Sequence, residues 1–329
     1  MRRIFILDDA KYLMPSYLRF VRGVVDAADL PLNVSREFLQ NNKDIDRIRT
    51  ASVKKILNEL KRIAENNPES YVQFWREFGK VLKEGMVEDH ENQKTLAELL
   101  RFCTTHDDEE AQTVSLANYV KRMPMKQKGI YFITADSYAA ASTSPHLEIF
   151  RKNDIEVLLL TDPVDEWLVT SLSDYEEKPL KSIAKGTLDL DEFATDDQKK
   201  AAEEKGKDLT GLVEKIQAVL SDRVKEVRVS HRLTDSPACL VADDHDLGGN
   251  LERILQSMGQ DAPDAKPIME INADHPLIKQ LAPEHERLEE WSMVLFDQAA
   301  LSEGARLSEP AAYVKRVNDL LTRASLLTT

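Results

Sequence analysis

The sequence predicts an α/β protein with α+β character that is built from several domains. Its 329 residues are too many for a single simple core. Amphipathic helices dominate residues 17–102, a strand–helix–strand unit follows at 130–161, and the last part mixes strands with helices. These observations predict a helical connector, a small α/β/α unit with a short sheet, and a C-terminal α+β domain that ends in helices.

Helical periodicity characterises the first part of the chain. The run Arg2–Leu7 reads as a strand, and we expect its sheet to lie upstream of these residues. Asn67 precedes Pro68, and the residue before a proline disfavours the α conformation, so a helix should end there. Apolar residues recur at helical spacing in the segments 17–26, 34–40, 45–64, 71–82 and 92–102.

Two short apolar runs, Ile130–Thr134 and Ile155–Thr161, have the length and composition of buried strands. The segment His146–Lys152 between them reads as a helix, and such a unit usually carries a parallel sheet. Units of this kind bind dinucleotides at a glycine-rich turn after the first strand. The turn here, residues 135–145, contains no glycine, so a dinucleotide site is not expected.

Charged and polar residues dominate residues 173–208, which we interpret as a linker. The domain beyond this linker should open with an amphipathic helix at Leu212–Leu220. Its other elements are expected to be strands at 226–230, 238–242 and 267–271 and helices at 288–301 and 311–321.

The composition excludes several kinds of partner. The chain has 44 Lys and Arg residues against 58 Asp and Glu residues, a net charge of −14. Nucleic acids and anionic membranes need a basic face, so neither is expected as a partner. No apolar run reaches the roughly 18 residues that suggest a membrane span, and no secretion signal is evident. Cys103 and Cys239 are far apart in apolar runs, which favours a reducing compartment and cytoplasmic residence.

Patterns of residues that carry catalysis or hold metals are not found in the sequence. Its seven histidines are scattered without metal-ligand spacing. Neither a nucleophile elbow nor a phosphate loop occurs. The paired acidic residues lie in segments typical of linkers, where solvated charge is their ordinary role. A stand-alone α/β enzyme is therefore the least favoured function, and no metal is expected.

One arginine has the setting of a phosphate-binding residue. The segment Asp29–Asn42 places Arg36 and Gln40 four residues apart on a short helix, so both side chains project from one face. A guanidinium group on a braced segment suits a phosphate held by another domain. The alternative is a solvated surface arginine, which is the common role of such a residue.

A stripe of apolar residues surrounds the glycine pair Gly248–Gly249. Each glycine costs about 1 kcal/mol relative to alanine inside a helix, so the pair should loosen the first helical turn. A stripe of this kind is usually part of a core, and the alternative is an exposed binding face. The apolar residues at helical spacing are Leu247, Leu251, Ile254, Leu255 and Met258.

The two closing helices also carry apolar residues at helical spacing. Both the core of one chain and an interface between two chains explain such a pattern. The residues concerned are Leu288, Trp291, Val294 and Leu295 in the first helix, and Tyr313, Val317, Leu320 and Leu321 in the second.

Six blocks follow one another in a fixed order: Arg2–Asp9, Tyr17–Asp26, Asp29–Glu37, Ile130–Thr134, Val164–Trp167 and His231–Pro237. Together they resemble the bacterial ninety-kilodalton heat-shock chaperone family over essentially the whole chain. The resemblance implies the latter part of the middle domain (residues 1–108), a small α/β unit of that domain (109–190), and a charged linker with the C-terminal dimerisation domain (191–329). The family's N-terminal ATP-binding lobe has no counterpart in these residues.

The resemblance also implies roles for individual residues. Arg36 and Gln40 would reach the γ-phosphate of ATP, which the separate lobe binds with Mg²⁺. The 329-residue chain on its own would therefore bind no cofactor and would not be an enzyme. Glu166 and Trp167 would contact client proteins, although Trp167 at the edge of a local core is an equal alternative. Thr170 replaces a polar amide of the bacterial family, which leaves the role of that position open.

In the same family, the stripe from Leu247 to Met258 binds partly unfolded clients. The closing helices pair with their copies in a second chain, as a four-helix interface with two-fold symmetry. Other bacterial chaperones are further implied partners. The sequence thus favours the client-binding and dimerising part of a chaperone, and the alternative is a dimerisation or scaffold module without client binding of its own.

Overall fold

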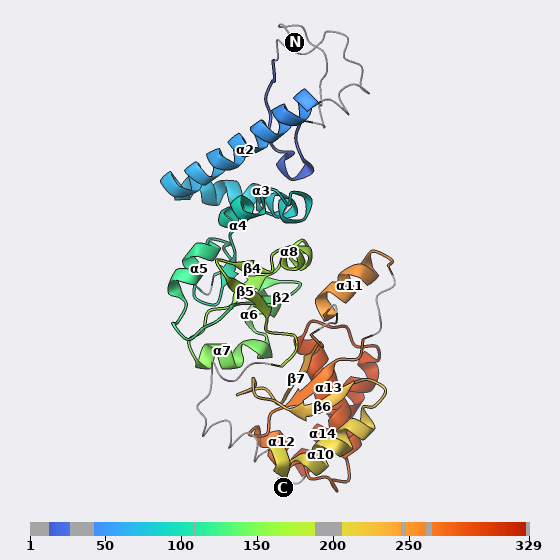
Figure 1. Ribbon diagram of the computed structural model, residues 1–329. Coiled ribbons are helices and arrows are strands. Elements are labelled where there is room, and N and C mark those ends of the chain that lie inside the picture. Colours follow the sequence, from blue (N-terminus) through green and yellow to red (C-terminus); the bar gives the residue numbers. More distant parts are fainter. Residues whose placement is uncertain are drawn as a thin grey trace. The chain divides into compact units, whose positions relative to one another are not determined.

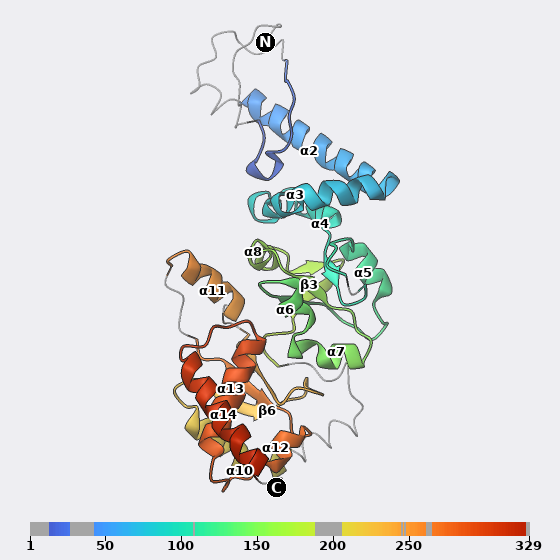
Figure 2. The ribbon, with the colours of Figure 1, turned by 180° about the vertical axis from the view of Figure 1, so that it is seen from behind.

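The computed structural model describes residues 13–26, 43–107, 109–187, 206–244, 246, 248–260 and 265–326 (Figures 1 and 2). The chain divides into two compact units. The first extends to Cys103 and includes Glu110–Arg122 and Val164–Glu177. The second comprises Thr104–Glu109, Met123–Pro163 and the chain from Lys178 onwards. The domain boundaries expected after residues 108 and 190 stay a prediction.

Helices build most of the first unit. Asn67 separates two of them, because its side chain accepts a hydrogen bond from the Ser70 amide at 3.2 Å and Pro68 occupies the first turn of the next helix. The helix end predicted at Asn67 is therefore confirmed. The elements are η1 (Ser16–Leu18), α2 (Lys43–Asn66), α3 (Pro68–Glu88), α4 (Gln93–Leu99), α5 (Leu116–Arg122), α8 (Asp165–Ser171) and the short strand β4 (Asp174–Tyr175).

A buried ion pair joins α3 to α8. Lys83 Nζ lies 2.8 Å from Asp165 Oδ1, and each side chain is only 1% exposed. Buried charges of opposite sign must stay together, because either one alone would lie unpaired in a poorly solvated interior. The pair therefore fixes the position of the first turn of α8.

The helix predicted at 17–26 is wrong. Only the three residues of η1 are helical, and the chain from Arg19 to Asp26 forms no helix or strand. Tyr17 and Leu18 are buried, whereas Val24, an apolar residue within the expected helix, is 95% exposed. Gly23 and the β-branched Val24 and Val25 have low helix propensity, and no tertiary contact compensates for it at Val24. The expected elements Arg2–Leu7 and 34–40 lie outside the described residues.

The second unit contains the predicted parallel sheet. β2 (Ile130–Thr134) pairs in parallel with β3 (Leu158–Leu160), with Phe132 opposite Leu158, as the strand–helix–strand pattern indicated. The connection between these strands contains α6 (Tyr138–Ser142), η2 (Pro145–Leu147) and α7 (Glu148–Lys152). The division of the chain into two units falls within the short strand β1 (Cys103–Thr104).

The prediction of a linker at residues 173–208 is wrong for the first part of that range. β5 (Lys178–Ser182) lies there and pairs in parallel with β2 on the side away from β3, with Ile130 opposite Leu180. None of the five residues of β5 is fully buried, so apolar periodicity does not reveal this strand. Backbone hydrogen bonds to β2 stabilise it instead. Residues 188–205 lie outside the described part of the chain.

A second sheet, in the order β6–β8–β7, forms the rest of this unit. β8 pairs in parallel with β6 and antiparallel with β7. Figures 1 and 2 show α13 beside α14, and α13 shares an apolar core with α10 on one face of the sheet. The elements are α10 (Thr210–Val219), β6 (Glu226–Val229), β7 (Ala238–Val241), α11 (Gly249–Ser257), β8 (Ile268–Ile271), α12 (Pro276–Gln280), α13 (Leu288–Ser302) and α14 (Pro310–Leu326).

The two faces of this second sheet bury different side chains, because successive strand residues point to opposite faces. Met269 and Ile271 of β8 join the core under α10 and α13. Ile268 joins Cys239 and Val241 on the other face. Glu270 is two residues after Ile268 in β8, so its side chain points to the same face of the sheet as that of Ile268. Its carboxylate therefore lies on the face away from α10 and α13, between apolar side chains.

Candidate functional site

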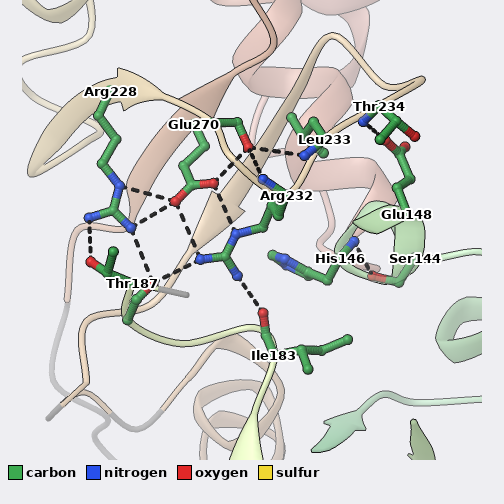
Figure 3. Close-up of polar contacts among 12 residues, drawn as sticks. Ser144, His146, Glu148, Ile183, Thr187, Arg228, Arg232, Leu233, Thr234 and Glu270 are labelled. Carbon is green, nitrogen blue, oxygen red and sulfur yellow. Dashed lines mark hydrogen bonds and ion pairs between the residues drawn. The ribbon is translucent and has the colours of Figure 1, made fainter. Parts of the chain in front are cut away.

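A charged cluster around Glu270 occupies this face of the sheet (Figure 3). Glu270 is 4% exposed and Arg232 is 1% exposed. Arg232 Nε donates to Glu270 Oε2 at 2.9 Å, while Arg228 Nη2 donates to Oε1 at 2.7 Å. The hydroxyl of Ser230 donates to Oε2 at 2.8 Å. Two guanidinium groups and a hydroxyl therefore surround one buried carboxylate.

The electrostatics of the cluster favour the ionised carboxylate. Burial on its own would raise the pKa of Glu270, but Arg232 and the hydrogen bonds from Arg228 and Ser230 together lower it below its ordinary value.

Burial raises the pKa of the neighbouring Cys239 thiol well above its usual range, and the charge of Glu270 adds to this effect. Cys239 is therefore a protonated core residue and not a reactive thiolate.

Arg232 also holds the chain that follows β5. Its guanidinium group donates to the carbonyl oxygen of Ile183, and its Nη2 donates to that of Gly186 at 2.8 Å. The cluster thus ties the loop after β6 to the segment that leaves the parallel sheet (Figure 3). Neither Arg232 nor Glu270 was predicted from the sequence to be an interacting residue. A glutamate inside the apolar strand Ile268–Ile271 was the available signal, because a buried charge needs a partner.

A second polar contact joins the same loop to α7. The Glu148 carboxylate accepts backbone hydrogen bonds from Thr234, Asp235 and Ser236 at 2.5, 2.8 and 3.0 Å. The adjacent His146 is fully buried, and its Nε2 lies 2.8 Å from Glu303 Oε1 just after α13. Polar groups of η2 and α7 thus lie against the loop after β6 and the chain after α13.

The predicted apolar stripe lies on α11. The helix begins after Gly248, whose φ of 88° suits glycine, and ends before Gly259, whose φ is 72°. None of its nine residues is buried. Leu251, Ile254 and Leu255 are half-buried, and Met258 is 62% exposed. Leu247 lies outside the described residues.

Trp167 is half-buried on α8, and the exposed Thr170 donates a hydrogen bond to its carbonyl oxygen at 2.7 Å. Glu166 is only 6% exposed, so its side chain offers little surface to another protein. The structure thus places the two predicted client contacts differently: the tryptophan is accessible in part, and the glutamate belongs to the interior.

The residues predicted at a dimer interface also separate into two groups. Leu288 and Leu295 of α13 are 6% and 0% exposed and belong to the core of one chain, and Trp291 packs against that core. On α14, Leu320 is 8% exposed, Tyr313 and Val317 are half-buried, and Leu321 is 63% exposed. The accessible apolar surface is therefore on α14.

Val314 adds to this surface and was missed in the sequence analysis. It is 53% exposed and precedes Leu321 by seven residues, so the two side chains share one face of α14. The inner face of α14 is held by Asp297 of α13, whose carboxylate lies 3.0 Å from Arg223 and 3.6 Å from Arg316. The helical spacing from Leu321 was the signal that could have identified Val314.

None of the helices described here is long and apolar enough to cross a membrane. In the described part of the chain, no group of three or more His, Cys, Asp or Glu side chains could hold a metal ion.

The class of protein follows from comparison with known families. The sequence model described as Hsp90 protein matches residues 1–327. The chain therefore belongs to the Hsp90 family of chaperones, and the resemblance inferred from its six sequence blocks is confirmed.

Within that family, the chain is similar to bacterial proteins named Chaperone protein HtpG. The protein from Nitrosomonas europaea is 55% identical over 97% of this chain and 51% of its own length. Those from Dechloromonas aromatica and Ruthia magnifica are 54% and 55% identical, over 98% and 97% of this chain and 51% of each relative. The chain thus spans about half the length of the curated relatives that it matches.

The cluster around Glu270 predicts a specific stability effect. Replacing Glu270→Gln leaves two arginines without their buried counter-ion and should lower the free energy of unfolding at pH 7 by about 3–5 kcal/mol. Because the folded-state pKa of Glu270 is lowered, its contribution is present above its unfolded pKa of about 4.3 and is lost as pH falls through the folded value. The free energies of unfolding of the parent chain and of Glu270→Gln, measured with urea, should therefore differ at neutral pH and become more similar at acidic pH. Glu226→Gln, at an exposed position of β6, is the control, and an equal loss in both variants contradicts the prediction.

Proposed function

We propose that this chain is the client-binding and dimerising part of an Hsp90-family chaperone. The observation that carries the proposal is α11, an amphipathic helix with no buried residue and a half-buried apolar stripe. Helices of globular proteins normally bury such a stripe against their own core. An apolar face that stays accessible in one chain suits a partner that offers apolar side chains of its own, as partly unfolded proteins do.

The residues that would bind clients are Leu251, Ile254, Leu255 and Met258, with Leu247 at the start of the stripe and Trp167 as a separate aromatic contact. Methionine and leucine adapt to differently shaped partners, because their side chains are flexible and carry no polar group that needs a fixed partner. Such a face favours many related clients over one defined sequence. Other bacterial chaperones are proposed partners of the same protein on the basis of the family alone.

Client binding can be tested with serine substitutions in the stripe. The double variant Leu251→Ser and Leu255→Ser should weaken binding of reduced, alkylated lactalbumin about tenfold, since two apolar contacts are lost. Its melting temperature should stay close to that of the parent, because neither side chain is buried. Gln256→Ser, at an exposed position of the same helix, is the matched control for both measurements. Normal binding by the double variant would leave a dimerisation or scaffold module as the function.

Homodimerisation is proposed through α14. Its outer face exposes Val314 and Leu321, while its inner face is fixed to α13 through Leu320 and Asp297. A rigid helix with an accessible apolar face suits an isologous contact, in which each copy offers the same surface to the other. Leu288, Trp291 and Leu295 support this face from the core below.

Charges on the outer face of α14 should prevent self-association. The double variant Val314→Glu and Leu321→Glu should behave as a monomer in multi-angle light scattering at micromolar concentration, whereas the parent chain should have twice that mass. Burying two carboxylates at a symmetric contact is unfavourable, because each faces a like charge from the partner. Thr322→Glu is the control for added charge on the same helix. A monomeric parent chain would refute the proposed dimer.

We also propose that Arg36 and Gln40, which lie outside the described residues, contact the γ-phosphate of ATP bound with Mg²⁺ by a separate lobe of the protein. A guanidinium group stabilises negative charge on a phosphoryl group when it is positioned against it. The 329 residues by themselves should therefore hydrolyse no ATP, and Arg36→Ala should change nothing in them. A rate of phosphate release comparable to that of a full-length relative would contradict this proposal.

A further inference from the structure

Polar contacts hold α11 in place within the second unit. Arg253 Nη2 lies 3.2 Å from Asp136 Oδ2, in the turn between β2 and α6, and donates to Asn250 Oδ1 at 3.2 Å. The Arg253 side chain is 26% exposed and that of Asp136 is 52% exposed. α11 has no fully buried residue, so apolar burial fixes its position less than it does for α10 and α13, which contribute several residues to the core.

The ion pair lies against the end of α13. A Cβ atom built on Gly304 would come within 3.7 Å of Arg253 Nη2 and 3.8 Å of Asp136 Oδ2. The φ of Gly304 is 77°, a conformation that favours glycine. The chain beyond α13 therefore turns closely past the Arg253–Asp136 pair.

A second contact holds the approach to α11. Lys185 Nζ donates to the Asp246 carbonyl oxygen at 2.7 Å, and Lys185 is paired with Ala242 in a parallel β-bridge. At the other end of the helix, every residue from Gln256 to Gln260 is exposed. These polar contacts are made before the helix and as far as Arg253 within it, and the residues from Gln256 onwards are exposed.

We infer that the Arg253–Asp136 ion pair is a salt-sensitive tether that limits how much of the α11 stripe a client can reach. The inference rests on the proposed client-binding function. While the pair is formed, Leu251, Ile254 and Leu255 stay half-buried. An ion pair between partly exposed groups is weak and is screened by salt, so it can open without unfolding the rest of the unit. Opening frees the helix to present its whole apolar face, and Arg253 is the positioning residue.

Hydrogen exchange of the complete chain tests the tether directly. In Arg253→Gln, amide exchange of peptides covering residues 249–258 should rise about fivefold at low ionic strength. Removing one such ion pair favours local opening of the helix by about this factor. The parent chain should approach the same rate near 0.5 M salt, where the Debye length is only about 4 Å. Lys279→Gln is a matched control, because Lys279 and Asp274 form an exposed pair at the same distance of 3.2 Å.

A charge swap separates the ion pair from the individual side chains. Asp136→Arg and Arg253→Asp should each raise the exchange of α11, and the combined variant should restore most of the protection. Equal exchange in Arg253→Gln and the parent chain, or no restoration in the swapped variant, overturns the tether.

Binding of reduced, alkylated lactalbumin tests the consequence for clients. Arg253→Gln should bind this probe about threefold more tightly at low ionic strength and should lose the salt dependence of the parent chain. Faster exchange with unchanged affinity overturns the regulatory role of the tether. Even if the tether is refuted in this way, loss of binding in the Leu251→Ser and Leu255→Ser double variant would still support client binding by α11. Intact binding in that variant would refute client binding by α11, whatever the exchange shows.

Discussion

The buried carboxylate of Glu270 constrains how several segments of the second unit can be arranged. It lies on a sheet face lined by Cys239, Val241 and Ile268, where an unpaired charge would be strongly unfavourable. Arg228 and Arg232 must therefore stay beside it, and Arg232 in turn binds the carbonyl groups of Ile183 and Gly186. One carboxylate thus fixes the loop after β6 and the chain that leaves β5. Glu148 reinforces this connection, because its carboxylate accepts three amide hydrogen bonds from the same loop.

In the described part of this unit, α11 and α14 each have an accessible apolar face, and the two faces differ in how they are supported. α14 buries Leu320 and pairs Arg316 with Asp297 of α13, so its inner face is held against the rest of the unit. α11 has no fully buried residue, and Arg253 joins it to Asp136 through a partly exposed ion pair. A rigid face suits a partner of constant shape, such as a second copy of the chain. A loosely held face suits partners whose shapes vary, because its side chains can adjust to each of them. This difference supports the assignment of dimerisation to α14 and client binding to α11.

Local sequence patterns predicted much of the fold where local and tertiary preferences agree. β2 was predicted at its observed bounds because a short, uninterrupted apolar run is typical of a buried strand. The boundary between α2 and α3 followed from the chemistry of Asn67 and Pro68. The failures occurred where one preference was considered alone. Periodicity suggested a helix at 17–26 although its glycine and β-branched residues disfavour one, and β5 has no apolar signature because its backbone pairing with β2 stabilises it.

The sequence by itself determined the family, the mixed α/β class, the parallel pairing of β2 with β3, and which helices carry apolar stripes. These properties depend on residue order and on periodicities that belong to single elements. Only the tertiary structure decided which stripe residues are accessible: it placed Leu288, Leu295 and Glu166 in the interior and left Val314, Leu321 and Met258 exposed. It also brought together Glu270 with Arg232, and Arg253 with Asp136, across 38 and 117 residues of sequence. Burial and ion pairing depend on which elements meet in space, and that information is not contained in the periodicity of any one of them.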